Sequence, residues 1–205
     1  MGAGGDVLQA LNISKAKVAV LFSGGLDCTV LARLLGDILT AGEKIDLINV
    51  AFENPRIAGQ FVKQKRTVLD IYEECPDRIT GRRAFEELEE CCPERRWRFI
   101  AANILFSETS AHKDTVVALM APHNTEMDLS IANTPVQDKC DFHVDDELYG
   151  GIKAAKRVLR LVADDLGLHG AAREKKRAIQ FCARTAKMQS GHVKGTAAIQ
   201  TFKQK

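Results

Sequence analysis

The strongest chemical signature in this chain is the stretch Ser23-Gly24-Gly25-Leu26-Asp27-Cys28. Two adjacent glycines let the backbone turn tightly and bring its N–H groups close to a phosphate. A helix that begins directly after the turn adds free N–H groups and the positive end of its dipole. Ser23 and Cys28 place a hydroxyl and a thiol at the rim. Asp27 repels phosphate, so its presence indicates either a bridging Mg²⁺ or a helix-capping role in a purely structural turn.

Two elements must position this stretch, a strand before it and a helix after it. The residues Lys17–Phe22 (KVAVLF) form an apolar, partly β-branched run without alternation, which is typical of a strand buried on both faces of a parallel sheet. After Asp27, leucine and isoleucine recur at helical spacing as far as Leu39, and Gly42 supplies a stop. The glycine pair therefore lies between a strand and a helix.

The rest of the chain continues this alternation of strands and helices. The predicted elements are a strand at 46–52, a helix at 57–72, a turn at 77–81, a helix at 82–91, a strand at 97–102, helices at 109–120 and from 127, and basic amphipathic helices at 154–166 and 171–188. This order predicts an α/β fold, a parallel sheet with helices on both faces and right-handed crossovers, followed by a basic helical C-terminal part. We expect a flexible N-terminal segment at 1–15, one domain at 16–190 with a loop or join at 133–151, and a loose tail at 191–205.

Length and composition exclude several classes of protein. The chain has 205 residues, 45% of them hydrophobic and 27% charged, which is ordinary for one globular domain and unlike a disordered chain. Its apolar runs are far shorter than the roughly 18 residues that a membrane span needs. The first residues lack the basic and apolar parts of a signal peptide, so we predict a cytoplasmic protein with no membrane partner. The six cysteines contain no C-x-x-C pair, which indicates free thiols rather than a zinc site.

The net charge of +2 conceals an asymmetry along the chain. Residues 1–150 carry 16 Lys and Arg against 24 Asp and Glu, a net charge of −8, whereas residues 151–205 carry 13 against 3, a net charge of +10. A basic segment of this kind binds nucleic acid, a polyphosphate or an acidic surface. Because no aromatic residues are interleaved and no nucleic-acid motif is present, the sequence does not favour a nucleic-acid partner.

The glycine stretch matches neither of the two commonest phosphate loops, because the chain lacks both G-x-x-x-x-G-K-[ST] and G-x-G-x-x-G. It is similar to S-G-G-x-D-[SC], the PP-loop of the ATP pyrophosphatase superfamily. The chain further resembles the synthetase half of the asparagine synthetase family. The matching stretches are VAVLFSGGLDCTVLA (18–32), DLINVAFENPR (46–56), PDRITGRRAFEEL (76–88), WRFIAANI (97–104), PHNTEMDLSIA (122–132) and EKKRAIQFCARTAKM (174–188).

The resemblance implies a reaction, its cofactors and its site. ATP with Mg²⁺ would activate the side-chain carboxylate of aspartate as an acyl-adenylate, pyrophosphate would leave, and ammonia would attack to form the amide. Carried over by position, the phosphates and Mg²⁺ would lie on Ser23, Gly24, Gly25, Asp27 and Cys28. Adenine would meet the backbone of Asn49, Val50 and Ala51. Lys176 and Arg177 would face the pyrophosphate and act with Asp27 as catalytic residues. Asp27 and Asp146 would be the metal ligands.

The sequence also departs from that family. No glutaminase half is present, so ammonia would come from solution or from a separate glutaminase domain or chain. The family's second acidic metal segment corresponds either to Asp146-Glu147 or to a deletion near residues 133–151. A shortened, non-catalytic domain that binds a nucleotide or a partner is therefore an alternative, and a PP-loop enzyme acting on tRNA is a third. We interpret Arg78 and Arg82 as a solvated or salt-bridged face, and Trp97 as core.

Overall fold

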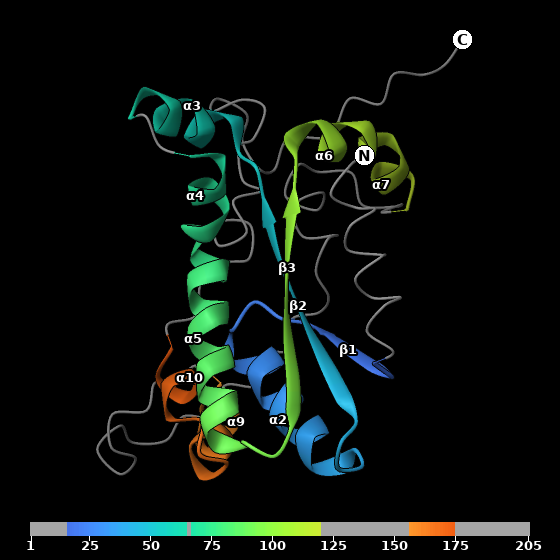
Figure 1. Cartoon of the computed structure of the whole chain (residues 1–205), viewed down its shortest axis with the longest axis vertical. Helices are drawn as coiled ribbons and strands as arrows, with labels where there is room; N and C mark the ends of the chain where they lie inside the picture. Colours follow the sequence, from blue (N-terminus) through green and yellow to red (C-terminus); the bar gives the residue numbers. More distant parts are fainter. Residues whose placement is uncertain (1–15, 65–66, 120–155, 175–205) are drawn as a thin grey trace.

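The computed structural model describes residues 16–64, 67–119 and 156–174 (Figure 1). The predictions for residues 1–15, 133–151 and 191–205, and those for Asp146, Lys176 and Arg177, lie outside these ranges. No helix in the described ranges combines the length and the apolar composition that crossing a membrane requires.

A parallel sheet carries the described fold. Its three strands within the described ranges are β1 (Val18–Leu21), β2 (Lys44–Phe52) and β3 (Arg96–Ile104), in the spatial order β1-β2-β3. Every pair is parallel, with Val20 opposite Leu47 and Leu47 opposite Phe99. Parallel neighbours require crossover connections, which here run through helices. The predicted α/β class, a parallel sheet flanked by helices, is confirmed.

Helices α2 (Leu26–Ile38) and α5 (Pro76–Cys91) provide the main crossovers and contact each other and β2. Two shorter helices, α9 (Arg157–Asp165) and α10 (His169–Arg173), pack against α2, and α10 also contacts α5. In Figure 1 these four helices lie together at the lower left of the sheet. The core between sheet and helices consists largely of fully buried apolar side chains, among them Phe22, Ile45, Leu47, Leu88 and Leu168. Trp97 is partly buried against this core, as predicted.

The first half of the β2–β3 connection differs from the prediction. The single helix expected at 57–72 is two helices, α3 (Pro55–Lys63) and α4 (Val68–Glu73). The turn expected at 77–81 is wrong, because these residues belong to α5. Pro76 occupies the start of that helix, where a missing N–H costs nothing. Glycine fits at position 81 inside α5 because a Cβ there would lie 2.4 Å from Asn49 Nδ2.

Two other predicted helices have different bounds within the described ranges. The helix predicted at 109–120 is divided into α6 (Phe106–Ala111) and α7 (Lys113–Leu119), with His112 capping the first. Of the helix predicted at 171–188, residues 175–188 lie outside the described ranges. Within those ranges α10 begins earlier, at His169, and ends at Arg173, since Glu174 has extended backbone angles, φ −60° and ψ 138°. The basic amphipathic helix predicted at 154–166 is present as α9.

Candidate functional site

The candidate site is the turn that joins β1 to α2. Gly24 has a φ of +75°, which residues other than glycine rarely adopt. A Cβ at this position would lie 2.4 Å from the Thr80 carbonyl group of α5. Gly25 is the N-cap residue of α2, and it makes no side-chain capping hydrogen bond to the first turn of that helix. The turn is therefore fixed against α5 by Gly24, and its conformation and its contact with α5 both require a glycine.

The N–H groups of the turn are not consumed by the neighbouring main chain. The Gly25 carbonyl accepts hydrogen bonds from Thr29 N and Thr29 Oγ1, at 3.1 and 2.8 Å. The Gly25 N–H makes a long contact of 3.4 Å with Ser23 Oγ. The Gly24 N–H donates to the Cys28 thiol. Within the described ranges, no acceptor is found for the N–H groups of the first three residues of α2. These donors, together with the positive end of the α2 dipole, form a surface that favours an anion.

Asp27 and Cys28 lie on this first turn of α2 and have opposite environments. The Asp27 side chain is 64% exposed, and its Oδ2 accepts a hydrogen bond from Lys156 Nζ at 2.5 Å. The Cys28 thiol is turned inward, donates to the Gly25 carbonyl at 3.1 Å and lies 3.6 Å from Ser23 Oγ. Burial raises the pKa of the Cys28 thiol above its ordinary value, which outweighs the opposing effect of the Ser23 hydroxyl. Cys28 is therefore a neutral donor that braces the turn.

A pocket of about 250 Å³ opens beside Gly24, between α5 and α10. Four carboxylates line it, together with Arg83, and they belong to Glu86, Glu87, Glu90 and Glu174. Glu87 accepts hydrogen bonds from the N–H groups of Gly170 and Ala171, and Arg83 pairs with Glu174 at 3.4 Å. This excess of negative charge repels phosphate. An anion bound at the turn is therefore favoured on the Asp27 side.

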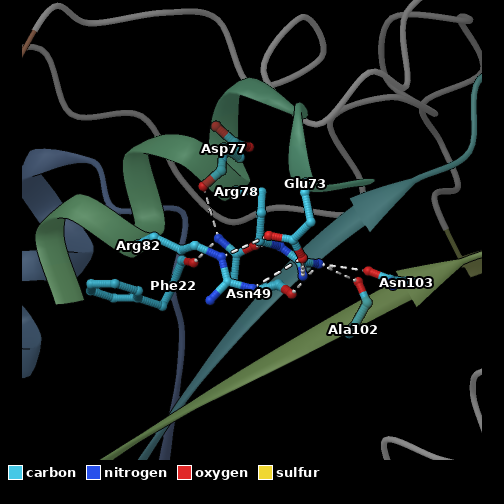
Figure 2. A network of polar contacts seen from close by, with 8 residues as sticks. All are labelled: Phe22, Asn49, Glu73, Asp77, Arg78, Arg82, Ala102 and Asn103. Carbon is cyan, nitrogen blue, oxygen red and sulfur yellow. Dashed lines mark hydrogen bonds and ion pairs between the residues drawn. The ribbon is translucent and has the colours of Figure 1, made fainter. Parts of the chain in front are cut away.

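Asn49, at the carboxyl end of β2, joins the strand to its surroundings by its side chain (Figure 2). Its Nδ2 donates to the Phe22 carbonyl at 2.8 Å and to the Asp77 carbonyl at 2.9 Å. Its Oδ1 accepts from Arg78 Nε at 2.7 Å. Since Phe22 directly precedes the glycine turn and Asp77 lies in the first turn of α5, Asn49 holds these two segments together. Both N–H donors of its amide and its carbonyl oxygen are therefore engaged.

Arg78 is fully buried beneath this network. The prediction of a solvated face is therefore wrong for this residue, whereas the predicted salt bridge is present, to Glu73. Its Nη2 donates to the Ala102 carbonyl at 3.1 Å and to Asn103 Oδ1 at 2.8 Å, and its Nη1 pairs with Glu73 at 3.2 Å. Burial lowers the pKa of Arg78, and the Glu73 charge opposes that effect. The guanidinium thus links the ends of β2 and β3 to α5.

Arg82, one helical turn further along α5, is exposed and salt-bridged, in agreement with its prediction. It donates to Glu73 from Nε at 2.7 Å and from Nη2 at 3.0 Å, and its guanidinium lies 5.2 Å from the ring centre of Phe99. The Arg82 hydrogen bond is the largest of the effects that lower the pKa of Glu73, although partial burial opposes them. The two arginines and Glu73 therefore form one structural network, and neither guanidinium is a phosphate clamp in this arrangement.

The structure brings some predicted site residues together. Ser23 to Cys28 form the turn after β1, and residues 49–51 lie in the neighbouring strand β2. The Ala51 side chain is buried against Tyr72 and Cys75. The assignments of these residues to ATP and Mg²⁺ stay predictions. The sequence analysis missed Lys156, which reaches the turn from α9 across 129 residues. Only its place at the start of a basic amphipathic helix was visible in the sequence.

Fold and site together define an α/β domain with a glycine turn at the carboxyl end of its first strand. An asparagine synthetase domain-containing protein of Drosophila melanogaster is 40% identical over 129 residues, covering 60% of this chain and 22% of its own length. Related proteins with the same description are 34% identical in Saccharomyces cerevisiae, over 62% of this chain and 23% of that protein, and 35% identical in Homo sapiens, over 57% and 22%.

These matches confirm the resemblance to asparagine synthetase domain-containing proteins over about three fifths of the chain. The chain spans less than a quarter of the length of the curated relatives that it matches. No family model matches the chain, and no solved structure matches it.

Proposed function

We propose that this chain binds ATP at the glycine turn and uses it to activate a carboxylate, in the manner of an asparagine synthetase. The carboxylate of aspartate would attack the α-phosphorus, pyrophosphate would leave, and ammonia would displace AMP to form the amide. The observation that carries the proposal is the turn itself, because the N–H groups of the first three residues of α2 lack acceptors among the described residues. The resemblance to asparagine synthetase domain-containing proteins supports the same chemistry.

The donor groups at the turn suit Mg²⁺ with a triphosphate. Mg²⁺ is usually held by one or two carboxylates together with phosphate oxygens and water, rather than by a complete cage of protein ligands. Asp27 offers one exposed carboxylate beside the free N–H groups. Within the described ranges, no three His, Cys, Asp or Glu residues are grouped to hold a metal without such help. Asp27 would therefore hold the ion together with the phosphates, and the ion would offset the negative charge on the leaving pyrophosphate.

The backbone of Val50 offers a place for adenine. The Ile48 carbonyl accepts from Phe22 N at 2.7 Å, so alternation in the ladder directs the N–H and carbonyl of Val50 to the same edge of β2. A continued ladder would join Val50 N–H to the Phe22 carbonyl, but Asn49 Nδ2 donates to that carbonyl instead. Val50 therefore presents a donor and an acceptor beyond the end of β1, where they suit the edge of a purine. The proposal narrows the predicted adenine contact at 49–51 to Val50.

Pyrophosphate release tests the proposed reaction. We expect the full chain, supplied with ATP, Mg²⁺, aspartate and ammonium, to release pyrophosphate in the presence of all four. Asp27→Asn should lower the rate by about 10²–10³, the usual effect of losing one preorganised charge contact. Asp37→Asn is the matched control, since Asp37 lies at the other end of α2 and pairs with Arg33. Equal rates for the Asp27 and Asp37 variants would reject the proposed role of the turn.

The second candidate is a domain that binds nucleotide without turning it over, and the ion pair between Asp27 and Lys156 favours it. A carboxylate already engaged by an ammonium group binds a metal less well than a free one. Calorimetric binding of ATP without pyrophosphate release under any combination of acid and amine would establish this alternative. The predicted contributions of Lys176, Arg177 and Asp146, and of a separate glutaminase domain or chain, belong to the first proposal, the asparagine synthetase-like reaction.

A further inference from the structure

Two carboxylates meet where β2 and β3 end. Glu53 directly follows β2, and Glu108 lies in the first turn of α6, the helix that follows β3. Glu53 Oε2 accepts from Phe106 N at 2.9 Å, and Glu108 Oε2 accepts from Leu105 N at 3.1 Å. Because Leu105 and Phe106 are neighbours in the chain, their N–H groups hold the two carboxylates close together.

The Tyr72 side chain of α4 covers the same part of the sheet. It is only 4% exposed and packs with Ala51 and Cys75. Glu53 N donates to the Ile104 carbonyl at 2.8 Å, so the ladder between β2 and β3 continues as far as Glu53. Side chains two residues apart on a strand share a face, so Glu53 lies next to Ala51 on the face that Tyr72 covers. Helices α4 and α6 lie at the same end of the sheet (Figure 1).

The hydroxyl of Tyr72 is a buried polar group that makes no hydrogen bond to the described residues. Buried hydroxyls are nearly always paired, and an unpaired one costs free energy. Burial raises the pKa of Tyr72, and the negative charges of Glu53 and Glu108 raise it further. The hydroxyl therefore stays protonated and lies within electrostatic reach of both carboxylates. Such a hydroxyl beside two carboxylates marks a place for a small polar ligand.

The chemistry of these three groups favours a monovalent cation. They offer a ligand oxygen atoms from two charged carboxylates and one phenol. A water molecule would satisfy the hydroxyl but would not reduce the repulsion between the carboxylates, whereas a cation does both. Because the hydroxyl is nearly sealed from solvent, the ion must be about as large as water, which is true of ammonium and potassium. Within the described part of the chain, no three His, Cys, Asp or Glu residues are grouped to hold a metal ion, which argues against a divalent one.

We infer that Tyr72, Glu53 and Glu108 form a binding site for a monovalent cation of the size of ammonium or potassium. The bound ion joins α4, the end of β2 and the start of α6. The site goes beyond the proposed function and does not rest on it, because Glu53 lies three residues past the Val50 backbone proposed for adenine and belongs to a different part of the sheet edge from the glycine turn.

Thermal unfolding in different chloride salts tests this site. The full chain is heated in ammonium, potassium, sodium and N-methylglucamine chloride at equal ionic strength, so that general screening is the same. Ammonium or potassium should raise the midpoint saturably. At ten times the dissociation constant the folding equilibrium rises about 11-fold, which raises the midpoint by about 3–6 °C for a chain of this length. N-methylglucamine is too large for the site and should give no rise, and the ion that saturates at the lower concentration is the ligand.

Two variants locate the ion. Tyr72→Phe removes only the hydroxyl, so in N-methylglucamine it should unfold at the parent midpoint or above it, because an unsatisfied buried group is lost. Its affinity for the ion should fall about tenfold, so the 11-fold effect becomes about twofold at the same concentration. Glu53→Gln removes one charge and should weaken the effect at least as much. Glu43→Gln is the matched control, since Glu43 pairs with Lys17 at the other end of β2 and should leave the rise unchanged.

Three results would overturn the inference. Equal midpoints for the parent chain in all four salts show that the ends of β2 and β3 hold no such ion. An equal rise in the parent chain and in both variants places the ion elsewhere. A midpoint of Tyr72→Phe that falls by the same amount in every salt shows that the hydroxyl is bonded within the protein. Pyrophosphate release is measured separately, so the proposed reaction stands or fails independently of these results.

Discussion

The buried Arg78 guanidinium should be a major source of stability for the ends of β2 and β3. Its Nε and Nη2 groups supply hydrogen bonds to Asn49 Oδ1 and Asn103 Oδ1, and Nη2 also reaches the Ala102 carbonyl. Arg78→Met keeps most of the side-chain volume but leaves these acceptors without their donor. Each buried acceptor left unsatisfied costs about 1–3 kcal/mol, and Glu73 keeps its second partner Arg82. We therefore expect a loss of about 2–4 kcal/mol in the free energy of unfolding.

Urea denaturation followed by circular dichroism measures this loss as a fall in the transition midpoint at constant slope. Arg83→Met is the matched control, because Arg83 lies in the same helix, is exposed, and makes only the long ion pair with Glu174 described above. Exposed pairs of this kind contribute at most about 1 kcal/mol. If the two variants had the same midpoint, the network around Arg78 would carry no more energy than a surface ion pair, and the reasoning would be refuted.

Three further predictions concern the turn and its neighbours. Gly24→Ala combines a positive φ with a collision against Thr80, so it should destabilise the chain by about 2 kcal/mol more than Gly42→Ala, which has a positive φ in open space, as urea midpoints will show. The lowered pKa of Glu73 gives stability that is present above its ordinary pKa and is lost as the pH falls through the lowered one. Glu73→Gln should therefore reduce the fall in the free energy of unfolding between about pH 5 and pH 3, and an unchanged dependence on pH would contradict this. The raised pKa of Cys28 should make its alkylation by iodoacetamide at pH 8 slower than that of free cysteine, measured on the tryptic peptide by mass spectrometry.

The sequence predicted the elements whose signals are local. The apolar run before Ser23 and the leucine spacing after Asp27 locate β1 and α2 to within a residue or two, because both depend on periodicity within the segment itself. The class of fold followed from the alternation of such segments. The start of α5 was misread, because proline and glycine within six residues are typical of a turn. The reason for a glycine at position 81 lies in another element, because a Cβ there would collide with the Asn49 side chain of β2.

The interactions at the site depend on distant residues, and the sequence could not predict them. Arginine is seldom buried, and nothing near Arg78 in the chain shows that acceptors from β2 and β3 meet at its position. Asn49 lies at the strand end where it was expected, but its amide holds the fold together and only the neighbouring backbone faces the turn. The pairing of Lys156 with Asp27 crosses more than half of the chain, and a left-handed lysine leaves no pattern in the sequence.

Two groups of charged side chains lie near the glycine turn, and their difference in charge affects where an anion binds. Glutamates of α5 line the pocket next to Gly24, whereas Lys156 of α9 pairs with Asp27. The pocket includes Gly24, and Lys156 pairs with Asp27, so both groups of side chains adjoin the turn that carries the free N–H groups of α2. The backbone alone therefore does not decide where a phosphate binds. Side-chain charge decides it, because a phosphate group is repelled by the first group and attracted by the second. Reversing the charge of Lys156 should therefore weaken pyrophosphate binding more than removing it, whereas neutralising Glu90 should strengthen binding only slightly, since Glu90 lies outside the turn.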